Sequence, residues 1–380
     1  MIELSSRKQI KILILGILIL IAFVYLIHGF SNLISGNNLP VDLALRYWQA
    51  KELILEHKNI YKLSEHAQYP PSFYLFLIPF LQFFSYQFAD LAWLFVNLLL
   101  MLSAGYILTK LAKDLPNLLK WFLPLSFFCF HAIPHGLGVG QVHLIISIGL
   151  LIYVYLSESD TKIYISQTIA LFFLTVALGK LSLSIPFALL FLFEKNHRKN
   201  ILYAILINFI LSWLILYFAN SSILEYVELL LKNSKAVTSL GHIDIQRLTT
   251  FLGLPPFVSL ILGISMLLTF IFIIKTYLST IWDKLAIAAL TARFFMYHAH
   301  YDNTILIFVL IALFMKAASI QARRIEYLIL VLFSFSLIIP ARFLEWNAPT
   351  YGLFLIFQVL IWLSSGWFII NKKYPKKSDC

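Results

Sequence analysis

The sequence predicts an all-α polytopic membrane protein with about twelve transmembrane helices and juxtamembrane helices in its first outer loop. Hydrophobic residues make up 61% of the 380 residues and charged residues only 12%, against about 45–50% and about 25% in an average soluble domain. Such a chain cannot cover its surface with polar groups, so its solvent is lipid. The basic residues behind the net charge of +11 form short clusters between apolar runs. This pattern is typical of cytoplasmic loops and not of a nucleic-acid-binding patch.

The apolar segments define the predicted spans. Arg7, Lys8 and Lys11 precede the first apolar run, which resembles a signal peptide. The run is too long for a typical signal-peptide core and no small-residue cleavage site follows it, so we interpret it as a retained first span. The predicted spans are 9–29, 88–110, 118–133, 141–157, 163–179, 182–194, 200–219, 256–275, 282–297, 303–318, 325–340 and 350–370. Two cysteines, Cys129 and Cys380, indicate neither a disulfide framework nor a metal site.

The apolar run 71–86 decides the topology. If it crossed the membrane, three lysines would lie outside: Lys110, Lys113 and Lys120. If it instead lies along the surface or dips in without crossing, every loop on one side is basic and both termini are cytoplasmic, as the positive-inside rule requires. We therefore predict a surface helix here, within a single membrane domain 1–380 whose long outer loops are about 30–87 and 220–255.

Asp42 follows the first span closely. The segment that it opens, D-L-A-L-R-Y-W-Q-A-K-E-L-I-L-E, predicts an amphipathic helix in the membrane interface, with an apolar face shared by Leu43, Tyr47, Ala50 and Ile54. As the N-cap of this helix, Asp42 could simply satisfy free N–H groups, and spacing alone favours that interpretation. Ionisable residues at membrane depth usually serve a function, so Asp42 is also a candidate catalytic residue.

Two further outer motifs have both a structural and a functional interpretation. In Y-P-P, the two prolines hold Tyr69 extended and can begin a helix at Pro71, which is also an ordinary stiff start to any helix. In G-V-G-Q-V-H, two glycines precede a span whose first turn carries Gln141 and His143. Free N–H groups at a helix N-terminus favour an anion such as phosphate, whereas the alternative is a plain glycine-rich turn.

Several cations lie on the predicted outer side, against the charge rule. Lys180, Arg247 and Arg293 share this property, which suits an anionic lipid-borne ligand, although a lone lysine at a span end often only snorkels to the interface. His298 and His300 point about 200° apart on a helix, so we expect hydrogen-bond donors at a cavity mouth, or a polar helix end, in place of shared metal ligands.

Taken in order, these motifs resemble those of the polyprenol-phosphate-sugar-dependent glycosyltransferases of family 87, in the GT-C superfamily, whose members include mannosyltransferases of bacterial glycolipids. The resemblance covers the chain from Asp42 to Tyr301. It rests on Asp42…Tyr47…Ala50…Asn59…Tyr61…Tyr69-Pro70-Pro71, on the glycine-glutamine motif at Gln141, on the G-K turn at Lys180 and on H-x-H-Y ending at Tyr301. His143 stands where the family commonly has Asn.

The resemblance implies a GT-C-like fold and a transfer reaction at the outer face of a bacterial inner membrane. Asp42, as the first outer-loop acidic residue, would be the general base that takes the acceptor hydroxyl's proton, with inversion at the anomeric carbon. A polyprenyl-phosphate-linked sugar, a hexose such as mannose, would be the donor, and a glycolipid or glycan the acceptor. The phosphate would be bound by Lys180, Arg247, His298, His300 and Tyr301. Substrates would be positioned by Tyr47, Tyr61, Tyr69, Gln141 and His143. Because the phosphate leaves already ionised, no metal or cofactor is expected.

Other function classes remain open. A polymerase or ligase of lipid-linked glycans shares the size, location and substrate type, and its key residues would lie in a late outer loop such as 220–255. That function would leave Asp42 and Tyr-Pro-Pro unexplained. A secondary transporter typically has internal repeats and midplane charges, and the sequence has neither. A purely structural membrane protein does not explain why the polar residues gather on one side.

Overall fold

The computed structural model describes residues 2–34, 41–64, 67, 69–83, 85–113, 120–159, 164–236, 244–295, 299–317, 324–339 and 348–371. These residues form helices and their connections, without a strand among them, so the predicted all-α architecture is confirmed. The first elements are α1 (Ile2–Ile34), α2 (Val41–Ala50), the π-helical turn η1 (Lys51–Leu55), α3 (Ile60–Leu63), α4 (Pro71–Tyr74), η2 (Leu75–Leu77), α5 (Ile78–Phe83), α6 (Tyr86–Leu111), α8 (Phe122–Phe128), α9 (Ala132–Gly138) and α10 (His143–Glu158). Those that follow are α11 (Tyr164–Ala177), α12 (Leu181–Phe193), α13 (Lys195–Phe218), α14 (Ile223–Ala236), α15 (Ile245–Phe251), α16 (Pro256–Thr276), α17 (Ile281–Phe295), η3 (His300–Leu306), α18 (Ile307–Ala317), α19 (Arg324–Ile338) and α21 (Ala348–Asn371).

Six helices within the described ranges are long and apolar enough to cross a membrane. They are Ile12–Leu33, Phe88–Leu111, Lys195–Phe218, Phe257–Thr276, His300–Ala317 and Gly352–Asn371. The membrane character of the chain is thereby confirmed, but the predicted count of about twelve spans is not.

The predicted spans that fall short are broken or brief helices. The predicted span 118–133 is divided between α8 and the start of α9 by the segment Cys129–His131. The apolar run 71–86 also breaks, into α4, η2 and α5, which together cover 71–83. Thirteen helical residues rise only about 20 Å, less than the roughly 30 Å of the hydrocarbon core.

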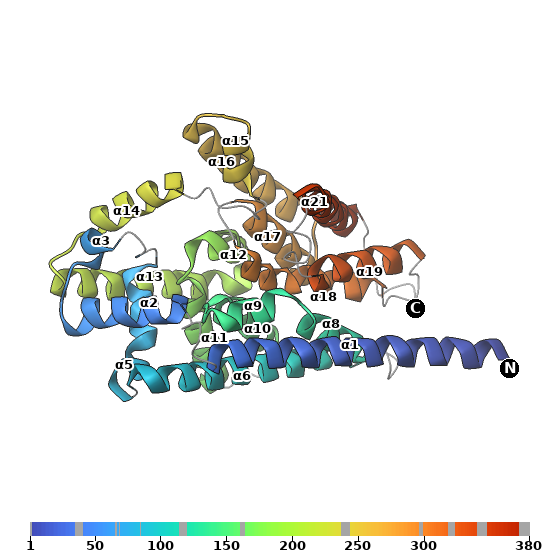
Figure 1. Cartoon of the computed structure of the whole chain (residues 1–380). Helices are drawn as coiled ribbons and strands as arrows, with labels where there is room; N and C mark the ends of the chain where they lie inside the picture. Colours follow the sequence, from blue (N-terminus) through green and yellow to red (C-terminus); the bar gives the residue numbers. More distant parts are fainter. Residues whose placement is uncertain are drawn as a thin grey trace.

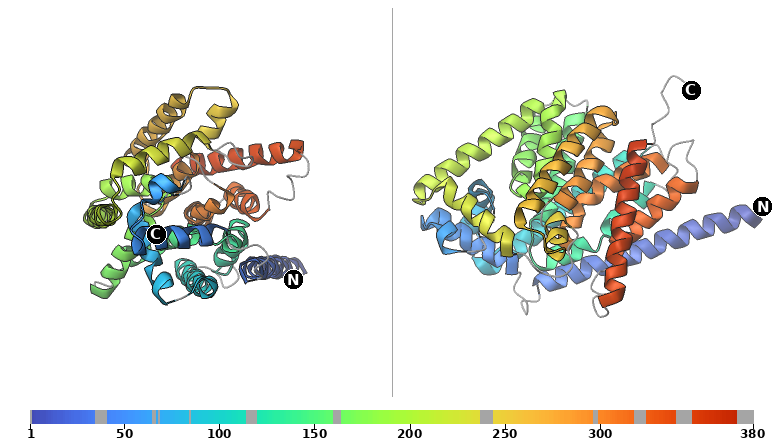
Figure 2. Two further views of the ribbon diagram at one scale, coloured as in Figure 1. Left: turned by 60° about the vertical axis from the view of Figure 1, so that its left-hand side comes forward. Right: turned by 90° about the horizontal axis from the view of Figure 1, so that it is seen from above.

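The helices form two flanks around a buried centre. Figure 1 shows α1 and α6 along one flank and α15, α16 and α21 along the opposite one, and the turned views agree (Figure 2). Between them lie α10, α12, α17 and α18, and every residue of α18 except Met315 is buried. The flanking helices expose large apolar side chains, as lipid contact requires: Leu13, Leu20, Phe23, Phe95, Leu102, Leu260, Leu268, Leu353 and Leu360.

One end of the bundle is held by ion pairs. Lys284 Nζ lies 2.7 Å from Glu194 Oε1, which ties the start of α17 to the junction of α12 and α13. At the same end the buried Lys316 and Asp283 pair at 3.2 Å. His197 Nε2 lies 3.0 Å from Glu158 Oε1. Lys284 and Lys316, both predicted to face the cytoplasm, therefore lie at one end of the molecule.

The opposite end carries α2, α3 and α14, away from the N-terminal end of α1 (Figure 1). Here Asn59 of the predicted N-x-Y motif donates from Nδ2 to Glu225 Oε2 at 2.6 Å, and Lys62 pairs with Glu225 Oε1 at 2.7 Å. Tyr61 packs edge-on against Tyr226, with ring centroids 5.2 Å apart. We call this contact between α3 and α14 the outer clasp; it joins the two long outer loops that the sequence predicts.

The outer clasp should weaken in acid. Lys62 and then Asn59 lower the pKa of Glu225 from its ordinary 4.5 to about 2. The ionised Glu225 carboxylate therefore contributes its full stabilisation of the clasp above about pH 4.5, and this contribution is lost as the pH falls toward 2. Hydrogen exchange of α3 and α14 peptides in lipid nanodiscs, corrected for intrinsic rates, should therefore be faster at pH 3 than at pH 6. The change Glu225→Gln should remove most of this difference, whereas Glu228→Gln, at an exposed site on the same helix, should preserve it. Equal protection at both pH values in the unaltered protein would contradict the role of Glu225.

Candidate active site

Asp42 lies in the first turn of α2, which begins at Val41. Its backbone N–H donates to the carbonyl of Val139 at 3.2 Å, in the glycine-rich turn after α9. Among the described residues, the half-buried carboxylate of Asp42 makes no hydrogen bond or ion pair. It therefore does not act as the helix cap that spacing alone favours. The predicted apolar face is real, since Leu43 and Ala50 are buried.

Tyr69 is held extended by the two prolines, as predicted. Pro70 has φ −56° and ψ 147°, and α4 begins at Pro71. The buried Tyr69 ring stacks on Phe73, with centroids 4.6 Å apart, and its carbonyl accepts the Tyr61 hydroxyl at 3.3 Å. The Tyr69 hydroxyl donates to Gln141 Oε1 at 3.3 Å.

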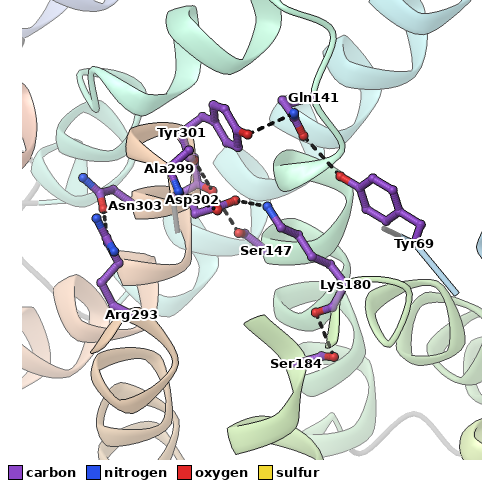
Figure 3. Close-up of polar contacts among 11 residues, drawn as sticks. Tyr69, Gln141, Ser147, Lys180, Ser184, Arg293, Ala299, Tyr301, Asp302 and Asn303 are labelled. Atoms are coloured by element: carbon purple, nitrogen blue, oxygen red, sulfur yellow. Dashed lines mark hydrogen bonds and ion pairs between the residues drawn. The ribbon is translucent and has the colours of Figure 1, made fainter. Parts of the chain in front are cut away.

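The turn before α10 aims Gln141 at the other side of the site. Gly140 has φ 72°, a left-handed conformation that favours glycine. The Gln141 N–H then donates back to the Gly136 carbonyl at 2.9 Å, and the side-chain Nε2 donates to the Tyr301 hydroxyl at 3.0 Å. Gln141 therefore bridges Tyr69 and Tyr301, which lie 232 residues apart in the chain (Figure 3).

Lys180 and Asp302 form a buried ion pair beside Tyr301. Lys180 Nζ lies 2.5 Å from Asp302 Oδ1, and the two side chains are 16% and 1% exposed. Asp302 Oδ2 accepts the Ala299 N–H at 3.2 Å, and Lys180 Nζ lies 5.2 Å from the centre of the Tyr301 ring (Figure 3). Both oxygens of Asp302 are thereby engaged.

Histidines complete the surroundings of Tyr301. His135 stacks on its ring at 5.8 Å, and His143 lies 5.7 Å away on another side. His143 is fully buried against Gly136, where an added Cβ would lie 1.8 Å from the imidazole Cε1. We call the cluster of Tyr69, Gln141, His143, Lys180, Tyr301 and Asp302 the polar centre.

Electrostatics place Asp42 at the edge of the polar centre. Burial raises the pKa of Tyr69, and the nearby Arg46 lowers it in part. Asp302 and Asp42 each raise it further, so both carboxylates lie around Tyr69. Arg46 is buried one helical turn after Asp42, with its guanidinium carbon 4.6 Å from the centre of the Tyr69 ring. Burial lowers the pKa of Arg46, but its surroundings, Asp42 among them, raise it above its ordinary value.

The other predicted site residues in the described part of the chain are not members of the polar centre. Tyr61 supports the Tyr69 backbone, and Tyr47 is buried in α2 with its ring edge-on to Trp48. His300 begins η3 and is half-buried. Arg293, predicted to lie on the outer side of the membrane, is 1% exposed and donates to Asn303. His298 and the Arg247 side chain fall outside the described residues.

Sequence reasoning missed two important groups. Arg46 was detectable because it follows Asp42 by four residues, and such residues share a helix face. Asp302 was detectable as the acidic end of M-Y-H-A-H-Y-D. Within the described part of the chain, no three His, Cys, Asp or Glu side chains gather as a possible metal site.

Comparison with known proteins gives a match to a family model. The family model described as glycosyltransferase family 87 matches residues 67–340. Neither a curated protein nor a solved structure matches the chain.

The Lys180–Asp302 pair should be essential for stability. Lys180→Gln leaves a buried carboxylate without its counter-ion, which typically costs about 3–5 kcal/mol. Thermal unfolding in detergent should show this loss, and adding Asp302→Asn should restore part of it. As a control, Lys62→Gln breaks an exposed pair that is worth at most about 1 kcal/mol. A Lys180→Gln protein as stable as the unaltered one would contradict the pair's structural role.

Gly179 should be intolerant of a side chain. A Cβ there would lie 2.2 Å from Phe73 Cδ2 and 2.9 Å from the Val176 carbonyl oxygen. Gly179→Ala should therefore push Phe73 off Tyr69 and cost about 1–3 kcal/mol in thermal unfolding. Gly352→Ala is the matched control, because an added Cβ there meets no atom within 4 Å. Equal unfolding temperatures for the two variants would disprove the steric argument.

Proposed function

We propose, since the chain belongs to glycosyltransferase family 87, that this membrane glycosyltransferase transfers a sugar from a polyprenyl-phosphate donor to an acceptor hydroxyl, with Asp42 as general base. The sugar is a hexose such as mannose, and the acceptor is a glycolipid or glycan. The observation that carries the assignment is the carboxylate of Asp42, which none of the described residues engages, beside a densely bonded polar centre.

Asp42 is the better base of the two carboxylates around Tyr69. Asp302 has one oxygen on Lys180 and the other on the Ala299 N–H. Both contacts stabilise its charge and occupy its lone pairs, so it is a poor proton acceptor. Asp42, whose carboxylate has no such contact among the described residues, has lone pairs free for an incoming hydroxyl.

The reaction is a single displacement. The acceptor hydroxyl gives its proton to Asp42 while its oxygen bonds to the anomeric carbon from one side. The bond from that carbon to the phosphate oxygen breaks on the other side, and the bonding electrons leave with polyprenyl phosphate. The anomeric configuration is therefore inverted, and every proton and electron pair is accounted for without an oxidant or reductant.

The leaving phosphate requires nearby positive charge and hydrogen-bond donors. Arg46 supplies a buried guanidinium, and the Tyr301 hydroxyl lies between Gln141 and the histidine rings. Lys180 lies against the Tyr301 ring, but its charge is shared with Asp302. Among the described residues these three side chains best suit the phosphate, together with His300 at the start of η3; Arg247 and His298 stay predictions.

An apolar cavity of about 750 Å³ supports a lipid-linked donor. It lies between α15, α16, α17 and α21, and its walls include Phe270, Leu290 and Phe294. Leu363 and Trp367 line it and are also exposed, so it opens on a lipid-facing flank. An isoprenoid chain there would gain from burial in proportion to its apolar area. The helix α17 continues from this cavity to Arg293, which contacts Asn303 next to Asp302.

The membrane arrangement belongs to the same proposal. About twelve crossings, counting the shorter and broken helices, would put the basic loops and both termini in the cytoplasm. Asp42 and the polar centre would then face the extracytoplasmic side of a bacterial inner membrane. The outer clasp would lie on that side too.

Replacing Asp42 should abolish transfer without unfolding the protein. The purified protein is incubated with polyprenyl-phosphate sugars and a membrane glycolipid extract, and products are measured by mass spectrometry. Asp42→Ala and Asp42→Asn should lower the rate by about 10²-fold or more, the usual contribution of a general base. Glu52→Gln, which removes a half-buried carboxyl from η1, is the control and should stay active. Full activity of Asp42→Ala would eliminate the assignment, and substrate flux in sealed vesicles without a covalent product would favour a transporter.

A further inference from the structure

Asp42 and Arg46 are placed to form an ion pair, yet they do not. Residues four apart on a helix are neighbours, and an aspartate and an arginine at this spacing attract each other. The Arg46 guanidinium is directed elsewhere: Nη1 donates to Gln49 Oε1 at 2.7 Å, and the guanidinium carbon lies over the Tyr69 ring. The carboxylate of Asp42 forms no ion pair with any described residue.

Gln49 is itself fixed. Its Oε1 accepts the Tyr74 hydroxyl at 3.0 Å as well as the guanidinium, and its Nε2 donates to Ser64 Oγ at 3.0 Å. Gln49 is only 2% exposed. Because a guanidinium can only donate, reversing the amide would break the hydrogen bond to Arg46, whereas the Tyr74 and Ser64 hydroxyls could exchange their donor and acceptor roles.

An ion pair with Arg46 would disable a general base at Asp42. Charge-assisted hydrogen bonds from a guanidinium are short and strong, and they would occupy the carboxylate oxygens. They would also favour the ionised form and so lower the affinity of Asp42 for a proton. A guanidinium that is held away from Asp42 leaves both carboxylate oxygens available to the acceptor hydroxyl.

We infer that Gln49, backed by Tyr74 and Ser64, is a positioning residue that holds Arg46 away from Asp42 and so keeps the catalytic carboxylate free. The inference rests on the proposed function for the role of Asp42, but not for the position of the guanidinium. Within the described ranges, the charged and titratable groups that face this pair include Tyr69 from the segment before α4, Tyr74 from α4 and Tyr301 from η3, with Asp302 beyond Tyr69.

Two substitutions of Gln49 separate this role from simple packing. Gln49→Leu removes the acceptor at similar volume, so Arg46 loses the hydrogen bond that directs Nη1 away from Asp42. Gln49→Glu keeps an acceptor for both Arg46 and Tyr74, and Ser64 can donate to it. If Gln49 only fills space, leucine should be tolerated better than a buried carboxylate. If Gln49 holds Arg46, the glutamate variant should stay active and the leucine variant should not.

The transfer assay is run across pH with these variants. We expect kcat of Gln49→Leu to fall about 10- to 100-fold, a partial loss of the roughly 10²–10⁴-fold that a general base contributes, with little change in the KM for the donor. Its acidic limb should move to lower pH, because ion pairing lowers the pKa of Asp42. Gln49→Glu should keep most of kcat, because its carboxylate still accepts from the Arg46 guanidinium. Unchanged kcat and pH profile in Gln49→Leu would overturn the inference.

A cryo-EM structure of Gln49→Leu tests the same inference without any activity. The guanidinium of Arg46 should lie within ion-pair distance of Asp42, and its persistence over Tyr69 would refute the positioning role. The two proposals fail separately. An active Asp42→Ala protein removes the proposed base, whereas a guanidinium that stays in place removes only the role of Gln49.

Discussion

The ion pair of Lys180 and Asp302 is the constraint on which the polar centre depends. It joins the turn before α12 to η3 inside the bundle, where an unpaired charge would be intolerable. With both ends fixed, the Tyr301 ring is held between Lys180 and His135, and its hydroxyl meets Gln141. Gln141 in turn fixes Tyr69. Charge neutralisation within the pair thus positions side chains from three distant parts of the chain.

Composition and periodicity sufficed for the membrane character, the buried face of α2 and the helix start at Pro71, because these depend on local sequence. They did not suffice for the number of crossings. Pro134, just beyond the break between α8 and α9, has no N–H to donate to the Phe130 carbonyl, and the carbonyl of Leu337 on α19 accepts the His131 N–H there. Such a contact with a distant helix leaves no local signal.

The site was predictable by residue identity but not by contact. Ordered motifs selected Tyr69, Gln141, Lys180 and Tyr301, and the structure brings these together (Figure 3). The motifs could not show that Lys180 is already paired, since its partner lies 122 residues away. Nor could they show where Arg46 points, because spacing along α2 favours Asp42 while Gln49 and Tyr69 determine the outcome. Which of several possible partners a charged side chain contacts depends on the tertiary structure and not on spacing along the chain.

The two ends of the bundle differ in how firmly they are closed. Buried ion pairs hold one end, whereas the outer clasp depends on Lys62, whose side chain is 63% exposed, and on a partly exposed carboxylate. Exposed pairs are weak and screened by salt, so separating α14 from α3 costs far less than separating the opposite ends of the spans. The two ends of the molecule therefore differ in stiffness, and the end with the buried ion pairs is the stiffer one. Local opening between α3 and α14 is therefore expected to be more frequent than opening at the opposite end.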